Sequence, residues 1–284
     1  MQSLARRAEP NTPGKRRRLG RFDVLGVVSL LAFAATLWSG RSGLLEAQPE
    51  VSLHLDPQAL AEGFREGTAW HGLYRDGAKV GFSRTQRRRA DDGYENDHTL
   101  VLPVVSGEGL QTLHVRTELD ATFTLARFSA DATGGPIDVA ARGSWADGVL
   151  SIVVEGLPGG ALTQELPMPE APQMDQSFLP LASRDDLKAG DRFTFTHFDP
   201  LSASPSKATV VVVGTESLDL LGDTVQALRL RQEIGGQLLD VWVNELGEVL
   251  QQTLPGGLTA KRESEAQATW GVLIAGAPAQ WGPR

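Results

Sequence analysis

The chain has 284 residues, of which 41% are hydrophobic and 22% are charged, and it contains no cysteine. This composition is ordinary for a protein that buries a core, and the lack of cysteine excludes disulfides, thiolate metal sites, a cysteine nucleophile and a lipid-modified cysteine. Residues 51–284 carry 19 basic and 31 acidic side chains, a net of −12, so we expect no nucleic-acid partner.

The N-terminus combines a basic segment with an apolar one. Residues 1–22 carry seven basic side chains and one acidic side chain, whereas residues 24–40 carry no charge. Extending the apolar run through Leu45 brings it close to the ~20 residues that cross a bilayer. We therefore predict a cytoplasmic tail over residues 1–22 and a transmembrane helix over residues 23–45. The anchoring side chains of this helix are Val24, Leu30, Phe33, Leu37 and Trp38.

The charge distribution predicts the orientation of this anchor. Because the positive residues precede the apolar run, the N-terminus stays in the cytoplasm and the C-terminal part is exported. Only 5 of the 27 basic residues are lysine, and with the abundant glycine this indicates a GC-rich bacterial genome. We expect a single-pass protein of the bacterial inner membrane with a periplasmic or other extracytoplasmic domain. The alternative is a cleaved signal peptide, although no convincing small-x-small cleavage site follows the apolar run.

Residues 46–68 form a predicted linker with a short helix. Asp56 and Pro57 are a typical N-cap and first-turn pair, and residues 58–65 have room for two or three helical turns. This helix would space the following domain from the bilayer, and a flexible stalk is the alternative.

Residues 69–168 and 189–266 are predicted to form two β-rich lobes, separated by a connector at residues 169–188 and followed by a tail at 267–284. Strand-like segments alternate with the turn signals Asp76-Gly77, Asp147-Gly148 and Gly235-Gly236. Turns at intervals of roughly 8–12 residues indicate an all-β, antiparallel meander. We expect a curved sheet, a half-barrel or a sandwich.

Residues 113–125 show the clearest alternation. The odd positions are mostly apolar and the even positions are all polar, over thirteen residues. At about 3.3 Å per residue this pattern predicts a strand, or a bent pair of strands, about 40 Å long.

Few side chains suggest chemistry. His197 and Asp199 fall on one face of a predicted strand, where a carboxylate could orient a histidine base, but the end of a buried strand followed by a turn is the more ordinary explanation. Trp70 and Tyr74 share another strand face, which is either core or part of a binding surface. These four residues are the candidate ligand or partner face. We find no metal-binding spacing and no nucleophile motif, and we predict no catalytic residue and no cofactor.

Residues 70–82 read WHGLYRDGAKVGF, which fits the pattern W-x-G-x-Y-x-x-G-x-x-x-G-[YF]. This segment resembles the opening hairpin of a β-rich domain that precedes the transglutaminase-like core of some bacterial exported proteins and also occurs alone. Residues 198–200 and the hairpin at 241–249 are similar to later features of that domain. The second hairpin also resembles one in the half-barrels of periplasmic lipoprotein carriers. Because a transglutaminase-like core needs a cysteine, the resemblance implies the accessory fold alone, and no catalytic residue carries over.

These observations support three functions. The first is a non-catalytic, membrane-tethered envelope module that binds a partner protein or an envelope ligand. The second is a lipid or lipoprotein carrier, which requires a large apolar cavity. The third is a hydrolase centred on His197 and Asp199, in which His197→Ala would abolish activity without unfolding the domain.

Overall fold

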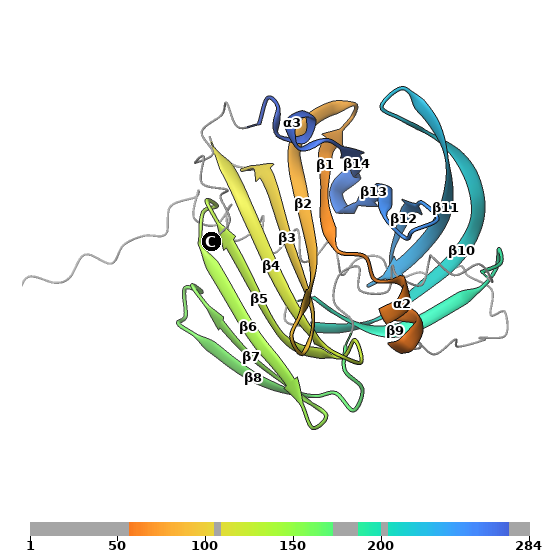
Figure 1. Cartoon of the computed structure of the whole chain (residues 1–284). Helices are drawn as coiled ribbons and strands as arrows, with labels where there is room; N and C mark the ends of the chain where they lie inside the picture. Colours follow the sequence, from red (N-terminus) through yellow and green to blue (C-terminus); the bar gives the residue numbers. More distant parts are fainter. Residues whose placement is uncertain (1–56, 105–108, 173–186, 200–203, 273–284) are drawn as a thin grey trace, which may run out of the picture.

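The structure is a computed structural model that describes residues 57–104, 109–172, 187–199 and 204–272 (Figure 1). The predicted basic tail and membrane anchor lie outside the described residues, as do about half of the linker, much of the connector and most of the C-terminal tail. Within the described part, no helix combines the length and the apolar character needed to cross a membrane.

The described strands confirm the all-β prediction and form one antiparallel sheet, which is not closed. Its order is β8-β7-β6-β5-β4-β3-β2-β1-β14-β13-β12-β11-β10-β9. The strands are β1 (Gly67–Arg75), β2 (Ala78–Ala90), β3 (Gly93–Pro103), β4 (Leu110–Asp120), β5 (Leu125–Thr133), β6 (Val139–Ala146), β7 (Val149–Glu155), β8 (Leu162–Pro167), β9 (Arg192–Asp199), β10 (Ser204–Leu220), β11 (Asp223–Ile234), β12 (Gln237–Val243), β13 (Val249–Leu254) and β14 (Leu258–Glu263).

The two predicted lobes belong to this single sheet. The first strand pairs with the last, and the β1–β14 register places Trp70 opposite Glu263 and Tyr74 opposite Thr259. From this seam, β2 to β8 extend to one side and β13 to β9 curve to the other (Figure 1). The chain therefore begins and ends its sheet at the centre, and the free edges belong to strands from its middle.

The predicted hairpins are confirmed where glycine-containing turns connect strands. Asp147 and Gly148 join β6 to β7 with φ values of 50° and 76°, a left-handed pair that suits a two-residue hairpin. Asp76 and Gly77 join β1 to β2 in the same way, with φ values of 50° and 81°.

The alternation at residues 113–125 does not correspond to one long strand. β4 ends at Asp120, whose carboxylate accepts hydrogen bonds from the backbone N–H groups of Thr122 and Thr124, at 2.8 and 2.9 Å. These bonds turn the chain back into β5, and Phe123 takes a left-handed φ of 57°. Phe123 is a turn residue, but its side chain points inward and packs on Tyr94. It therefore continues the apolar–polar alternation from which the sequence predicted a strand.

The inner face of the sheet is the face that carries Leu119, Phe128, Ile152, Leu230 and Val241, and it holds the main hydrophobic core. The ring of Phe128 on β5 lies 5.5 Å from the ring of Phe198 on β9, centroid to centroid, and Phe198 is fully buried. Because β5 and β9 are far apart in the strand order, this contact shows that the sheet curls until its two halves meet.

The predicted linker helix is present as α2 (Pro57–Gly63), but it is part of the domain. Leu60 and Phe64 are buried in the core at the inner face, and Phe64 contacts Tyr94 and Phe123. Because Leu60 of this helix packs into the core of the domain, the helix does not fit the expected role of a spacer between the domain and the bilayer.

A second short helix, α3 (Glu265–Thr269), crosses the predicted boundary between lobe and tail. Ser264 caps it through a reciprocal pair of hydrogen bonds with Gln267. Its buried Ala268 packs with Phe82 and Val101 in a separate apolar cluster, which Trp70 also contacts. Because Trp70 and Phe82 lie on the face of the sheet opposite the main core, α3 covers part of this outer face.

Candidate functional site

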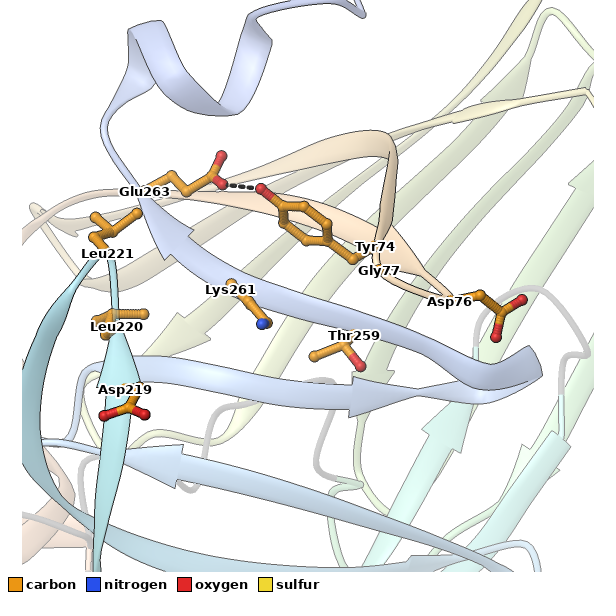
Figure 2. Close-up of a pocket in the computed structure, with 9 residues that line it drawn as sticks. All are labelled: Tyr74, Asp76, Gly77, Asp219, Leu220, Leu221, Thr259, Lys261 and Glu263. Carbon is orange, nitrogen blue, oxygen red and sulfur yellow. Dashed lines mark hydrogen bonds between the residues drawn. The ribbon is translucent and has the colours of Figure 1, made fainter.

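A pocket of about 290 Å³ lies at the outer face of the β1–β14 seam (Figure 2). One side is formed by Tyr74 of β1, the Asp76-Gly77 turn, and Thr259, Lys261 and Glu263 of β14. The other side is formed by Asp219, Leu220 and Leu221 at the tip of the β10–β11 hairpin. The site thus joins three parts of the chain that are far apart in sequence.

Strand alternation and register bring the seam residues together. On β1, Trp70, Gly72 and Tyr74 point to the outer face, and their partners on β14 are Glu263, Lys261 and Thr259. Gly72 leaves open the space between Trp70 and Tyr74. A Cβ atom at Gly72 would lie 2.5 Å from Oε2 of Glu263, so only glycine permits this carboxylate to lie against β1.

Glu263 is the centre of a buried polar network. Its side chain is 5% exposed, and Lys79 of β2 donates a hydrogen bond of 2.6 Å to its Oε2 atom. The Tyr74 hydroxyl donates a short hydrogen bond to Oε1, and Lys79 also donates to the backbone carbonyl of Gln267 in α3, at 2.6 Å. The network therefore ties together β1, β2, β14 and α3.

Tyr74 remains a hydrogen-bond donor in this network. Burial and the hydrogen bond to Glu263 raise the pKa of Tyr74 to about 12. The Nζ atoms of Lys79 and Lys261 lie 5.5 and 5.7 Å from the centre of its ring, within the range of cation–π attraction. These contacts fix the ring at the wall of the pocket, and its hydroxyl stays protonated at neutral pH.

The β10–β11 hairpin reaches the pocket because its outer half extends beyond β12. We call this half, residues 214–227, the arm. The register of β10 shifts between Val212 and Gly214, where Gly214 has a φ of 135°. Glu216 of the arm accepts a short hydrogen bond from the indole N–H of Trp242, and its Oε2 atom lies 3.5 Å from Arg229. The arm is thereby attached to the outer face, with its tip over the pocket (Figure 2).

Only one of the four predicted ligand-face residues lines this pocket. Tyr74 is a wall residue. Trp70 lies next to it on the same face of β1, but its ring packs against Phe82 beneath α3, at 5.9 Å between centroids. His197 and Asp199 lie on the edge strand β9, opposite Ser206 and Ser204 of β10. The structure therefore separates the four residues into two regions.

Sequence reasoning missed Lys261, Glu263 and the arm residues. Thr259, Lys261 and Glu263 alternate with Leu258 and Ala260, which is a weak signal of a strand with one polar face. Nothing in the sequence pairs that face with the one carrying Trp70, Gly72 and Tyr74. Among the residues that the structure describes, no group of three or more histidine or acidic side chains is arranged to hold a metal ion.

Comparisons with known proteins give little further information. No family model matches the chain, and no curated protein matches it. One solved structure is similar, that of a DUF1089 family protein from Pseudomonas aeruginosa. It is 17% identical, the alignment covers 66% of this chain and 94% of that chain, and the TM-score is 0.37. The resemblance of residues 69–266 to an accessory domain of transglutaminase-like proteins stays a prediction.

Proposed function

We propose that this protein is a non-catalytic, membrane-tethered binding module of the bacterial envelope, and that its ligand or partner binds at the outer-face pocket. The observation that carries the proposal is the construction of the pocket wall. Glu263, its most buried ionisable group, is already bonded to Tyr74 and Lys79 and so acts to shape the wall. The side chains that face solvent, Lys261 and Leu221 among them, are positioned for contact.

The tether rests on the sequence. Residues 24–40 are uncharged and follow a basic segment, which is the pattern of an N-terminal anchor with a cytoplasmic tail. The domain starting at α2 would then lie outside the cytoplasm.

A lipid or lipoprotein carrier receives less support. Such a carrier needs a large apolar cavity, but side chains from α2 and from both halves of the sheet pack into one core at the inner face. Six of the nine residues that line the pocket at the outer face have polar or charged side chains. A hydrolase centred on His197 would have its active site on the edge strand β9, away from the pocket. This alternative predicts that His197→Ala abolishes activity without unfolding the domain.

The topology half of the proposal can be tested by protease accessibility. The full chain, with a C-terminal epitope, is expressed in a Gram-negative host, and spheroplasts are treated with protease. We expect the folded domain to be accessible from outside the inner membrane and to fractionate with that membrane. A domain protected in the cytoplasm, or one released in soluble form after cleavage near residue 45, would contradict the proposal.

A further inference from the structure

Three charged side chains of the pocket form no ion pair with any described residue. They are Lys261 of β14, Asp76 of the β1–β2 turn and Asp219 of the arm, and all three are exposed. Lys261 contacts the ring of Tyr74, and Asp219 accepts a hydrogen bond of 3.1 Å from the Thr224 hydroxyl. By contrast, the charge of Glu263 is compensated by Lys79 at 2.6 Å.

These opposite charges restrict the ligand. A simple anion that approaches Lys261 also meets the carboxylates of Asp76 and Asp219, whereas a simple cation that approaches those carboxylates meets Lys261. Like charges brought close together are unfavourable, and this cost reduces the gain from the attractive contact. A molecule that carries both charges can pair with Lys261 and with a carboxylate at the same time.

We propose that the pocket binds a zwitterion in which an amine and an anionic group are joined by a short spacer, the chemistry of phosphoethanolamine and of amino acids. This inference rests on the proposed function and names the ligand class of the same site. The ammonium of Lys261 and the hydroxyl of Thr259 contact the anionic group, and the carboxylate of Asp76 contacts the amine. Leu220 and Leu221, at the tip of the arm, form the side of the pocket away from Asp76 (Figure 2).

The chain offers matched controls for a test. Asp147 stands in an Asp-Gly hairpin turn with the same φ of 50° as Asp76, but it lies between β6 and β7 and outside the pocket. Asparagine tolerates this left-handed conformation, so Asp76→Asn and Asp147→Asn remove one charge from equivalent turns. Lys188 is exposed and outside the pocket, which makes Lys188→Met the control for Lys261→Met.

The experiment is a calorimetric titration of the full chain in a maltoside detergent. The probes are glycerophosphoethanolamine, inorganic phosphate and ethanolamine. We expect saturable binding of glycerophosphoethanolamine and much weaker binding of the two singly charged probes. Lys261→Met and Asp76→Asn should each weaken it by about tenfold or more, and the two controls should change it by less than about twofold. Equal binding of phosphate or ethanolamine, no binding of the zwitterion, or binding that the pocket variants leave unchanged would overturn the inference.

Two further probes identify the source of the zwitterion. If dihexanoyl-phosphatidylethanolamine binds more tightly than glycerophosphoethanolamine, the pocket contacts a lipid surface; if alanine binds as well as either, it takes a free small molecule. The proposed function would fail if the domain were not exported, whereas the ligand inference would fail if the zwitterion did not bind. The two failures can therefore be told apart.

Discussion

At the residue scale, the absence of a side chain at Gly72 determines how the pocket wall is built. The position lies between Trp70 and Tyr74 on β1 and faces Lys261 across the seam, while the carboxylate of Glu263 occupies the space where its Cβ would be. The glycine at position 72 therefore has a local physical reason.

We expect Gly72→Ala to destabilise the fold by roughly 1–3 kcal/mol, the usual cost of overpacking a buried site. The added methyl group would lie 2.5 Å from Glu263 Oε2 and would force this carboxylate away from Tyr74 and Lys79. Urea unfolding of the purified protein measures the change. Gly159→Ala is the control, because a Cβ at Gly159 meets no atom within 4 Å. Equal stability of the two variants would show that the Glu263 carboxylate does not depend on the space at Gly72.

His71 is a second residue with a defined role. It is 5% exposed on the inner face, and its Nε2 atom lies 3.1 Å from the carbonyl oxygen of Val249, so Nε2–H donates to that carbonyl in the neutral ring. Burial, together with the nearby charge of Arg262, lowers the pKa of His71 to about 4.

The lowered pKa predicts a pH-dependent loss of stability. Between about pH 6.5 and 4 the unfolded chain binds a proton at His71 that the folded chain does not, so the free energy of unfolding falls as the pH falls through this window. The full effect is on the order of 3 kcal/mol. His71→Gln, which keeps an N–H donor, should flatten the profile there. An unchanged slope in His71→Gln would assign the pH dependence to other groups.

At the element scale, the outer face of β2, β3 and β4 carries a ladder of ion pairs. Asp97 accepts hydrogen bonds from Arg84 at 3.1 Å and from His114 at 2.8 Å, and Glu95 bridges Arg88 and Arg116. Burial alone would raise the pKa of Asp97 and of Glu95, but these bonds outweigh it and hold both pKa values below their usual range. Both carboxylates therefore stabilise the fold above their unfolded pKa, and this contribution is lost as the pH falls through the lowered folded values.

We expect Asp97→Asn to cost about 1 kcal/mol, because it removes a carboxylate shared by two cations on neighbouring strands. Asp131→Asn should change stability by less than about 0.5 kcal/mol, because Asp131 pairs with Arg142, whose side chain is half exposed. Thermal unfolding at neutral pH and low salt compares the two. A loss in Asp131→Asn as large as that in Asp97→Asn would contradict this ranking.

The sequence allowed the strands to be predicted better than their arrangement. Turns such as Asp147-Gly148 and the alternating segments beside them are determined by residues that are close together in the sequence. The strands β1, β2, β6, β7 and β12 could therefore be placed from the sequence. The turn at Asp120 was missed because Phe123 preserves the alternation. The pocket could not be predicted, because Tyr74 and Glu263 are 189 positions apart and only the β1–β14 pairing brings them together.

At the scale of the whole molecule, the two halves of the sheet depend on each other. The β1–β14 seam joins them at the centre, and the contact between Phe128 and Phe198 joins β5 to the edge strand β9. The fold should therefore unfold as a unit, although the sequence suggests two lobes.

We expect Phe198→Ala to destabilise the protein by roughly 3–5 kcal/mol, the usual cost of deleting a buried phenylalanine side chain. Because Phe198 is fully buried against Phe128, amide hydrogen exchange should increase in β4–β7 as well as in β9–β11. Leu238→Ala is the control, since Leu238 is 58% exposed. If exchange increased in β9–β11 alone, the two halves would be independent.

The central claim is that the outer-face pocket contacts a ligand or partner in the envelope. Site-specific photo-crosslinking in intact cells tests it most directly, with p-benzoylphenylalanine placed at Leu221 in the pocket or at Leu238 away from it. Both side chains are 58% exposed, so the two positions are equally accessible to chance collisions. We predict a reproducible crosslinked product, to lipid or to protein, from position 221 that is absent from position 238 and is reduced by Lys261→Met. The same products from both positions, or none from either, would contradict the claim.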